Sequence, residues 1–280
     1  MKPRSFPLAN GLNPIYRIIV YLFALPSVAA VPIGFPGGVV EVIVPPSTTT
    51  VSFNDIPQLR LDNRAIVALP LTTKPGDHVV IAHAAKSATE LPFKVMAKTY
   101  REQHLTLENP RLVDPLASDL QRIEAESLQM RRAYNLVSRM PTHLRPIRLP
   151  VQGIVTSEFG FRRFFNGQPR SPHSGVDIAA AQGTPVKSPA RGFVVVVGNF
   201  FFNGNTVLVD HGGGFISMLC HLSEVNVKQQ QRIEKDSIIG TVGATGRATG
   251  PHLHWSVSLQ GIRVDPLVFI DVINASANAE

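Results

Sequence analysis

Short apolar runs separated by turn residues recur along most of this chain and predict a mainly β protein. In the first part of the chain such runs occupy residues 39–44, 65–69 and 78–82, with Pro-containing breaks between them. Runs of this length between turn signals are typical of β-strands. We therefore expect a small β-sandwich-like module over residues 31–99. At about 70 residues it is small for an independent core, so it should pack against the rest of the chain.

A different periodicity follows this module. Between residues 115 and 140, apolar side chains recur every three or four positions with Arg and Glu between them. This spacing predicts a helix, and Asp114 or Ser118 could cap its start. Three prolines then follow before residue 151. Residues 100–150 are thus expected to form a connecting helix and a stiff Pro-rich linker.

Five side chains that could bind a metal ion lie in three short motifs in the C-terminal part of the chain. They are His173 and Asp177 in H-S-G-V-D, His221 in C-H-L, and His252 and His254 in H-L-H. Neutral imidazoles with one carboxylate form a ligand set of hydrolytic zinc sites, in which three protein ligands leave the fourth position for water. Two of the five groups are then left over. Hydrolysis also needs groups that move protons or stabilise developing charge.

The H-L-H motif is the most informative of the three when taken alone. It opens the strand-like run 252–259, in which residues two apart point to the same face. His252 and His254 should therefore lie side by side, and two buried imidazoles are costly unless a metal or hydrogen bonds satisfy them. Another apolar run predicts a strand that carries His221, with Cys220 on its opposite, core-facing side.

In chain order these motifs resemble those of the lysostaphin-type, or LytM-domain, zinc metallopeptidases. The shared segments are S-E-F-G-F-R at 157–162, H-S-G-V-D-I-A from His173, V-D-H-G-G-G from Val209, C-H-L, and G-A-T-G-R-A-T-G-P-H-L-H-W from Gly243. The resemblance implies a C-terminal antiparallel β peptidase domain over residues 151–272, followed by a tail over 273–280. A β module and a helix ahead of this domain make the chain similar to periplasmic members of the family in Gram-negative bacteria.

The resemblance also assigns roles to the five side chains. His173, Asp177 and His254 would bind one Zn²⁺ per chain, and His221 and His252 would form the catalytic pair. No H-E-x-x-H motif occurs in the sequence, so no neighbouring Glu can act as the general base and a histidine must do so. The sequence does not determine which of His221 and His252 transfers protons and which stabilises the oxyanion.

Two further positions bear on substrate contacts. Arg162 could bind a substrate carboxylate, or it could be a surface guanidinium packed on Phe159 or Phe161. Members of the family usually carry Tyr two positions before the histidine of C-H-L, whereas this chain has Leu219. Because Leu219 is expected on the same strand face as His221, a hydroxyl facing the cleft would be missing.

The first 30 residues have the order of a secretory signal peptide, with basic residues, then the apolar run 18–25, then small residues. That run is too short for an ordinary membrane-spanning helix, which needs about 20 residues. We therefore expect export to the periplasm, with membrane contact only through this segment if it stays uncleaved. The net charge of +7 is not clustered in a way that indicates nucleic-acid binding, and a single cysteine excludes an internal disulfide.

The resemblance implies a zinc-dependent endopeptidase that hydrolyses peptide cross-links of peptidoglycan, and the similarity to Gram-negative members indicates D,D bonds. The main alternative is a non-enzymatic relative that activates or scaffolds another cell-wall hydrolase. Such relatives typically lose metal ligands, and this chain keeps all three. A secreted metallopeptidase acting on proteins is a third possibility. The module over 31–99 would position or cover the active-site groove, or serve only as a spacer.

Overall fold

The structure is a computed structural model that describes residues 30–139, 144 and 146–275 of the 280-residue chain. The predicted signal segment and parts of the linker and of the C-terminal tail lie outside the described residues. The described residues from Val31 onward belong to one compact unit. Within the described part of the chain, no helix is long and apolar enough to cross a membrane.

Two small sheets form the N-terminal module. The first has the order β1 (Ile33–Gly34), β8 (Ser87–Val95), β7 (Gly76–Ala84), β3 (Thr50–Phe53) and β4 (Ile56–Pro57). The second has the order β2 (Val39–Ile43), β6 (Arg64–Ala68) and β5 (Leu59–Leu61). Val67 and Phe93 belong to the core between these sheets, whereas Ile66 joins the large core of the C-terminal part. The small module thus shares a core with the rest of the chain.

The C-terminal part is built on one large antiparallel sheet. Its order is β10 (Ile154–Ser157), β13 (Val176–Ala179), β21 (His252–Leu259), β17 (Phe215–Leu222), β16 (Gly204–Gly212), β15 (Gly192–Phe200) and β19 (Arg232–Ile233), and β22 (Ile262–Val264) also pairs with β21. A second sheet contains β14 (Pro185–Lys187), β20 (Ile238–Thr241) and β18 (Glu224–Val225). The predicted mainly β architecture, with an antiparallel C-terminal sheet, is confirmed.

A strand of the connecting segment pairs with the C-terminal part. β9 (Glu102–Leu105) runs parallel to β11 (Arg162–Phe165), which also pairs with β12 (Gln168–Pro169). The register places Gln103 opposite Arg163. After β9 the chain forms a short 3₁₀ turn, Pro110–Leu112, and then the helix α1 (Ala117–Tyr134).

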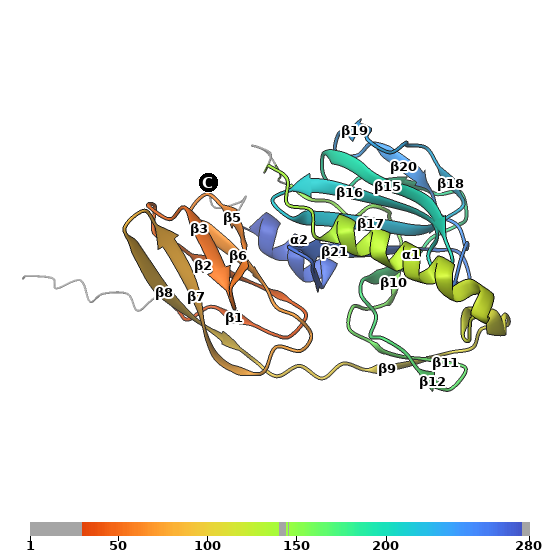
Figure 1. Ribbon diagram of the computed structural model, residues 1–280, viewed down its shortest axis with the longest axis horizontal. Helices are drawn as coiled ribbons and strands as arrows, with labels where there is room; N and C mark the ends of the chain where they lie inside the picture. Colours follow the sequence, from red (N-terminus) through yellow and green to blue (C-terminus); the bar gives the residue numbers. More distant parts are fainter. Residues whose placement is uncertain (1–29, 140–143, 145, 276–280) are drawn as a thin grey trace, which may run out of the picture. The chain divides into compact units, whose positions relative to one another are not determined.

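The helix α1 lies across one face of the large sheet (Figure 1), where Ala133 and Tyr134 pack into a cluster with side chains of β15, β16 and β17. Neither predicted cap is used. The N–H of Leu116 instead donates to Asp119 at 3.0 Å, while Asp114 accepts from Arg170 at 3.0 Å. The predicted caps are wrong because the N-cap position is Leu116, two residues away from each candidate.

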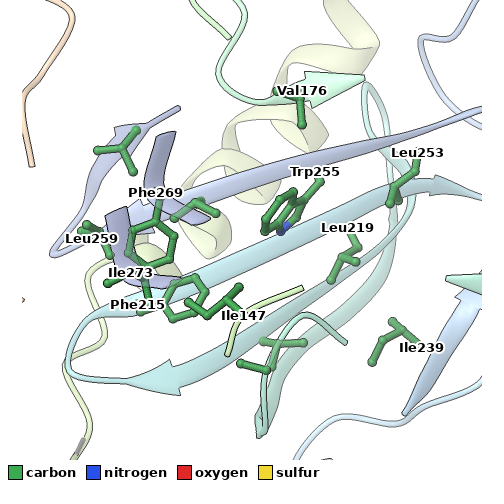
Figure 2. Close-up of a cluster of buried hydrophobic side chains, with 14 of the residues drawn as sticks. Ile147, Val176, Phe215, Leu219, Ile239, Leu253, Trp255, Leu259, Phe269 and Ile273 are labelled. Carbon is green, nitrogen blue, oxygen red and sulfur yellow. The ribbon is translucent and has the colours of Figure 1, made fainter. Parts of the chain in front are cut away.

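The opposite face of the large sheet covers the main hydrophobic core. Trp255, Leu219 and Phe215 pack there with Phe269 and Ile273 of the helix α2 (Pro266–Ala275) (Figure 2). All five side chains are completely buried. Burial of large apolar side chains contributes the main stabilisation of such a layer. Because alternate residues of β21 fill this core, the others are directed to the opposite face.

Candidate metal centre

β13 and β21 bring two of the candidate ligands together. The strands run antiparallel, and their register places Asp177 opposite His254. Leu253 and Trp255 belong to the core, so His252 and His254 lie on the other face of β21, as the two-residue period predicts.

His173 joins them from the loop before β13. Its N–H donates to the carbonyl of Phe161 at 2.9 Å, and its own carbonyl accepts from the N–H of Gly160 at 2.8 Å. Gly175 lets this loop approach β21, because a Cβ at that position would lie 2.4 Å from the carbonyl oxygen of Trp255. A larger residue at 175 would push the loop away from the strand.

Three potential ligand atoms converge between these segments. Nε2 of His173 lies 3.0 Å from Nδ1 of His254. Oδ1 of Asp177 lies 3.0 Å from Nε2 of His173 and 2.7 Å from Nδ1 of His254. Ligands bound at 2.0–2.1 Å to a tetrahedral zinc are roughly 3.3 Å apart. The three atoms therefore need to separate by only a few tenths of an ångström to hold such an ion.

The surrounding hydrogen bonds leave no proton inside this cluster when the histidines are neutral. Nδ1 of His173 lies 2.8 Å from the carbonyl oxygen of Glu158, which can only accept, so Nε2 carries a lone pair. Ser256 Oγ donates to Ser174 O at 2.7 Å and therefore accepts from Nε2 of His254 at 3.0 Å. Nδ1 of His254 is then also unprotonated. Three acceptor atoms face one another, and a cation bound by two nitrogens and one oxygen satisfies them.

Burial keeps the two histidines neutral. It lowers the pKa of His254 to about 4 and also lowers the pKa of His173, although Asp177 counteracts it in both cases. Burial alone would raise the pKa of the Asp177 carboxyl, but that pKa lies well below its usual range because the carboxylate faces two imidazoles, which would supply hydrogen bonds and positive charge if they were protonated. The cluster is therefore two imidazoles and one carboxylate near pH 7, the forms that metal binding requires.

His221 and His252 flank the cluster. Their ring centroids are 4.8 Å apart, and Nε2 of His252 lies 3.9 Å from Oδ1 of Asp177. Nδ1 of His221 donates to the carbonyl of Thr245, and Nδ1 of His252 donates to that of Gly250, both at 2.8 Å. Each ring thus keeps Nε2 for other contacts. Burial, together with the neighbouring imidazoles, lowers the pKa of His221 to about 3.

The expected placement of Leu219 is wrong. Leu219 is fully buried in the main core, whereas His221 lies beside His252 on the other face of the sheet. The reason is the backbone of His221, whose φ of +62° interrupts the strand alternation. Its N–H donates to the carbonyl of Asn203 at 2.9 Å. Met218, and not Leu219, lines the same cavity as His221.

A solved structure shows which family has this arrangement. The crystal structure of an M23 peptidase candidate from Pseudomonas aeruginosa is 41% identical in sequence, with a TM-score of 0.69, over 84% of this chain and 94% of that chain. The chain belongs to peptidase family M23. The sequence profile of that family matches residues 171–266, the range that contains all five candidate side chains.

Curated relatives align with a shorter part of this M23 protein. Peptidoglycan DD-endopeptidase ShyA from Vibrio cholerae is 38% identical over 114 residues, which are 40% of this chain and 26% of ShyA. DD-carboxypeptidase/endopeptidase Mpg from Neisseria meningitidis is 37% identical over 113 residues, again 40% of this chain and 26% of Mpg. The chain thus spans about a quarter of the length of these two relatives.

A second layer of contacts holds the carboxylate of the M23 site. Arg163 forms an ion pair with Oδ2 of Asp177 and donates to Ser157 Oγ at 3.0 Å. Gln103 of β9 accepts from Ser157 Oγ at 2.9 Å and from Nε of Arg163 at 3.2 Å. Sequence reasoning missed both Arg163 and Gln103. Gln103 lies on β9, so the connecting segment contributes to the surroundings of the metal centre.

Arg162, the candidate substrate contact, lies differently from its neighbour. Its side chain is 60% exposed and pairs with Glu102 at 3.2 Å. It is absent from the residues that line the cavity beside His173 and His254. A contact between Arg162 and substrate stays a prediction, whereas Arg163 reaches the cluster itself.

Proposed function

We propose that this M23 protein is a zinc-dependent endopeptidase that hydrolyses peptide cross-links of peptidoglycan in the periplasm, at D,D bonds. The convergence of unprotonated ligand atoms from His173, Asp177 and His254 carries the proposal. The names of the relatives ShyA and Mpg, a DD-endopeptidase and a DD-carboxypeptidase/endopeptidase, support the type of bond. The retained pair His221 and His252 favours an enzyme over a scaffold that only activates another hydrolase.

The arrangement divides the chemistry between the metal and the flanking histidines. Zinc held by His173, Asp177 and His254 would polarise the scissile carbonyl and lower the pKa of a bound water towards about 7. His221 and His252 present Nε2 beside that position, so they can accept the proton of the attacking water. Once protonated, an imidazole can stabilise the developing oxyanion by a hydrogen bond and then donate the proton to the leaving amine.

A direct test uses residues 31–280 with zinc and purified muropeptide dimers joined by a D,D cross-link. Monomers with a new D-Ala C-terminus, identified by chromatography and mass spectrometry, are the expected products. Dimers joined by an L,D cross-link are the matched control and should remain intact. Intact D,D dimers after incubation with the zinc-loaded protein would argue against the enzyme and for the scaffold.

Replacing Arg163 by Met should weaken zinc binding by about 10- to 100-fold, as for other outer contacts of metal ligands. The variant removes the guanidinium that pairs with Asp177 and leaves a mostly buried carboxylate less well held. The affinity is measured by competition with a chromogenic chelator, which does not depend on activity. Arg162→Met is the matched control on the same strand, and it should bind zinc like the unchanged protein. Equal affinities of the two variants would contradict the role of Arg163.

A further inference from the structure

Arg247 is a charged side chain beside the metal centre that the proposed mechanism does not use. It lies in the loop between β20 and β21. Together with His173, His221 and His254 it lines a cavity of about 160 Å³. A ligand in this cavity would therefore lie beside both Arg247 and the histidines of the metal centre.

The guanidinium is held in place by its neighbours. Its central carbon lies 4.4 Å from the ring centroid of Phe202 and 4.5 Å from that of Phe165. The N–H of Arg247 donates to the carbonyl of Phe202 at 2.8 Å. Gly246 has a φ of +72°, and a Cβ there would lie 2.3 Å from the backbone nitrogen of Gly204, so the loop lies directly against the neighbouring turn. Contacts with two aromatic rings restrict a guanidinium and lower the entropy lost when it binds a ligand.

The charge of Arg247 lacks an acidic partner within the residues that the structure describes. Nearby, Arg163 is paired with Asp177 and Arg170 with Asp114. No ion pair or side-chain hydrogen bond of Arg247 occurs in the same described ranges. Burial and the charges of the two other arginines lower the pKa of Arg247 to about 10, so it remains protonated near pH 7. A mostly buried, unpaired guanidinium favours an anionic ligand.

We propose that Arg247 binds a carboxylate of the substrate on a residue next to the scissile bond. This inference rests on the proposed function, because the cavity that Arg247 lines also contains the metal-centre histidines. The cavity is small, at about 160 Å³, which suits one small group of the substrate and not a long peptide segment. Stem peptides of peptidoglycan carry free carboxylates at their C-termini and on diamino acids. A guanidinium binds such a group through two parallel hydrogen bonds.

The experiment compares D,D-linked muropeptide dimers that carry free carboxylates with the same dimers converted to amides. The unchanged protein should hydrolyse the carboxylate form with a kcat/KM about 10- to 100-fold higher, as expected for a charge-assisted hydrogen bond. Arg247→Gln should lose this preference, mainly through a higher KM for the carboxylate form. Arg247→Lys keeps the charge without the planar fork and should retain part of the preference. Arg170→Gln is the matched control and should keep all of it.

Two results would overturn the inference: equal hydrolysis of both forms by the unchanged protein, or an undiminished preference in Arg247→Gln. A purely structural role predicts that Arg247→Gln and Arg247→Lys lose the same activity on both forms, which also counts against carboxylate binding. Thermal unfolding of each variant identifies misfolding, and Arg247→Lys then carries the test. Failure of the proposed function is distinct, because the unchanged protein would cleave neither form.

Discussion

Replacing His254 by Ala should remove the bound zinc and reduce hydrolysis of D,D-linked dimers to the background rate. His254 supplies one of three converging ligand atoms, and its Nδ1 lies 2.7 Å from Asp177 and 3.0 Å from His173. A site left with two ligands cannot form the three-ligand zinc centre that hydrolytic enzymes use. Metal content is measured on the dialysed protein by mass spectrometry, and hydrolysis is measured by chromatography of the muropeptides.

His252→Ala is the matched control on the same strand face. Its Nε2 lies 3.9 Å from Oδ1 of Asp177, outside the tight cluster, so this variant should keep one zinc ion per chain and still lose hydrolysis. The two variants together separate metal binding from catalysis. Stoichiometric zinc in His254→Ala would contradict the ligand assignment, and full activity of His252→Ala would contradict its catalytic role.

The strand periodicity of the sequence predicted the core of the metal centre well. The placement of His252 and His254 on one face of β21 required only the alternation of side chains along a strand, and the structure confirms it. The assignment of His173 and Asp177 to the same cluster came from the family motifs. Asp177 and His254 are far apart in the sequence and meet only because β13 pairs with β21. No local sequence rule predicts that contact.

The same alternation of side chains is interrupted in β17 at His221, so the prediction for this strand was wrong. Cys220 is buried, as expected, but it lies in the cluster beneath α1 and not on the core-facing side with Leu219. His221 also leaves the core side and lies beside His252. The positive φ of His221 depends on its bond to Asn203 and on the carbonyl of Thr245. Both partners come from other loops, so the residues next to His221 contain no sign of this conformation.

The outer contacts of the metal centre were also beyond the sequence. The S-E-F-G-F-R motif ends at Arg162, so the sequence indicated this residue as a candidate. In the structure the pleat of β11 directs Arg163 to Asp177 and Arg162 to Glu102. Gln103 contacts this layer only because β9 pairs in parallel with β11. A one-residue shift of that register would exchange the faces, and nothing in the hydrophobic pattern determines the register.

Replacing Trp255 by Ala should lower the free energy of unfolding by about 3–5 kcal/mol, the range for large aromatic residues truncated in a core. Trp255 is completely buried and lies in the sheet between Leu219 of β17 on one side and Val176 of β13 on the other (Figure 2). Its indole N–H donates to Ser217 Oγ at 3.3 Å, so the truncation also leaves a buried hydroxyl with one fewer partner. The resulting cavity would lie directly behind the metal centre, because His254 precedes Trp255 on the strand.

Urea unfolding of the metal-free protein, followed by far-UV circular dichroism, measures this loss. Chelator is included throughout because bound zinc would add its own stabilisation to the folded state. Fluorescence is unsuitable, since Trp255 is the only tryptophan of the chain. Ile154→Ala, at a side chain that is 75% exposed, is the control and should change stability by less than about 0.5 kcal/mol. A loss below about 1 kcal/mol in Trp255→Ala would show that the core behind β21 refills the space, contrary to the tight packing expected of protein interiors.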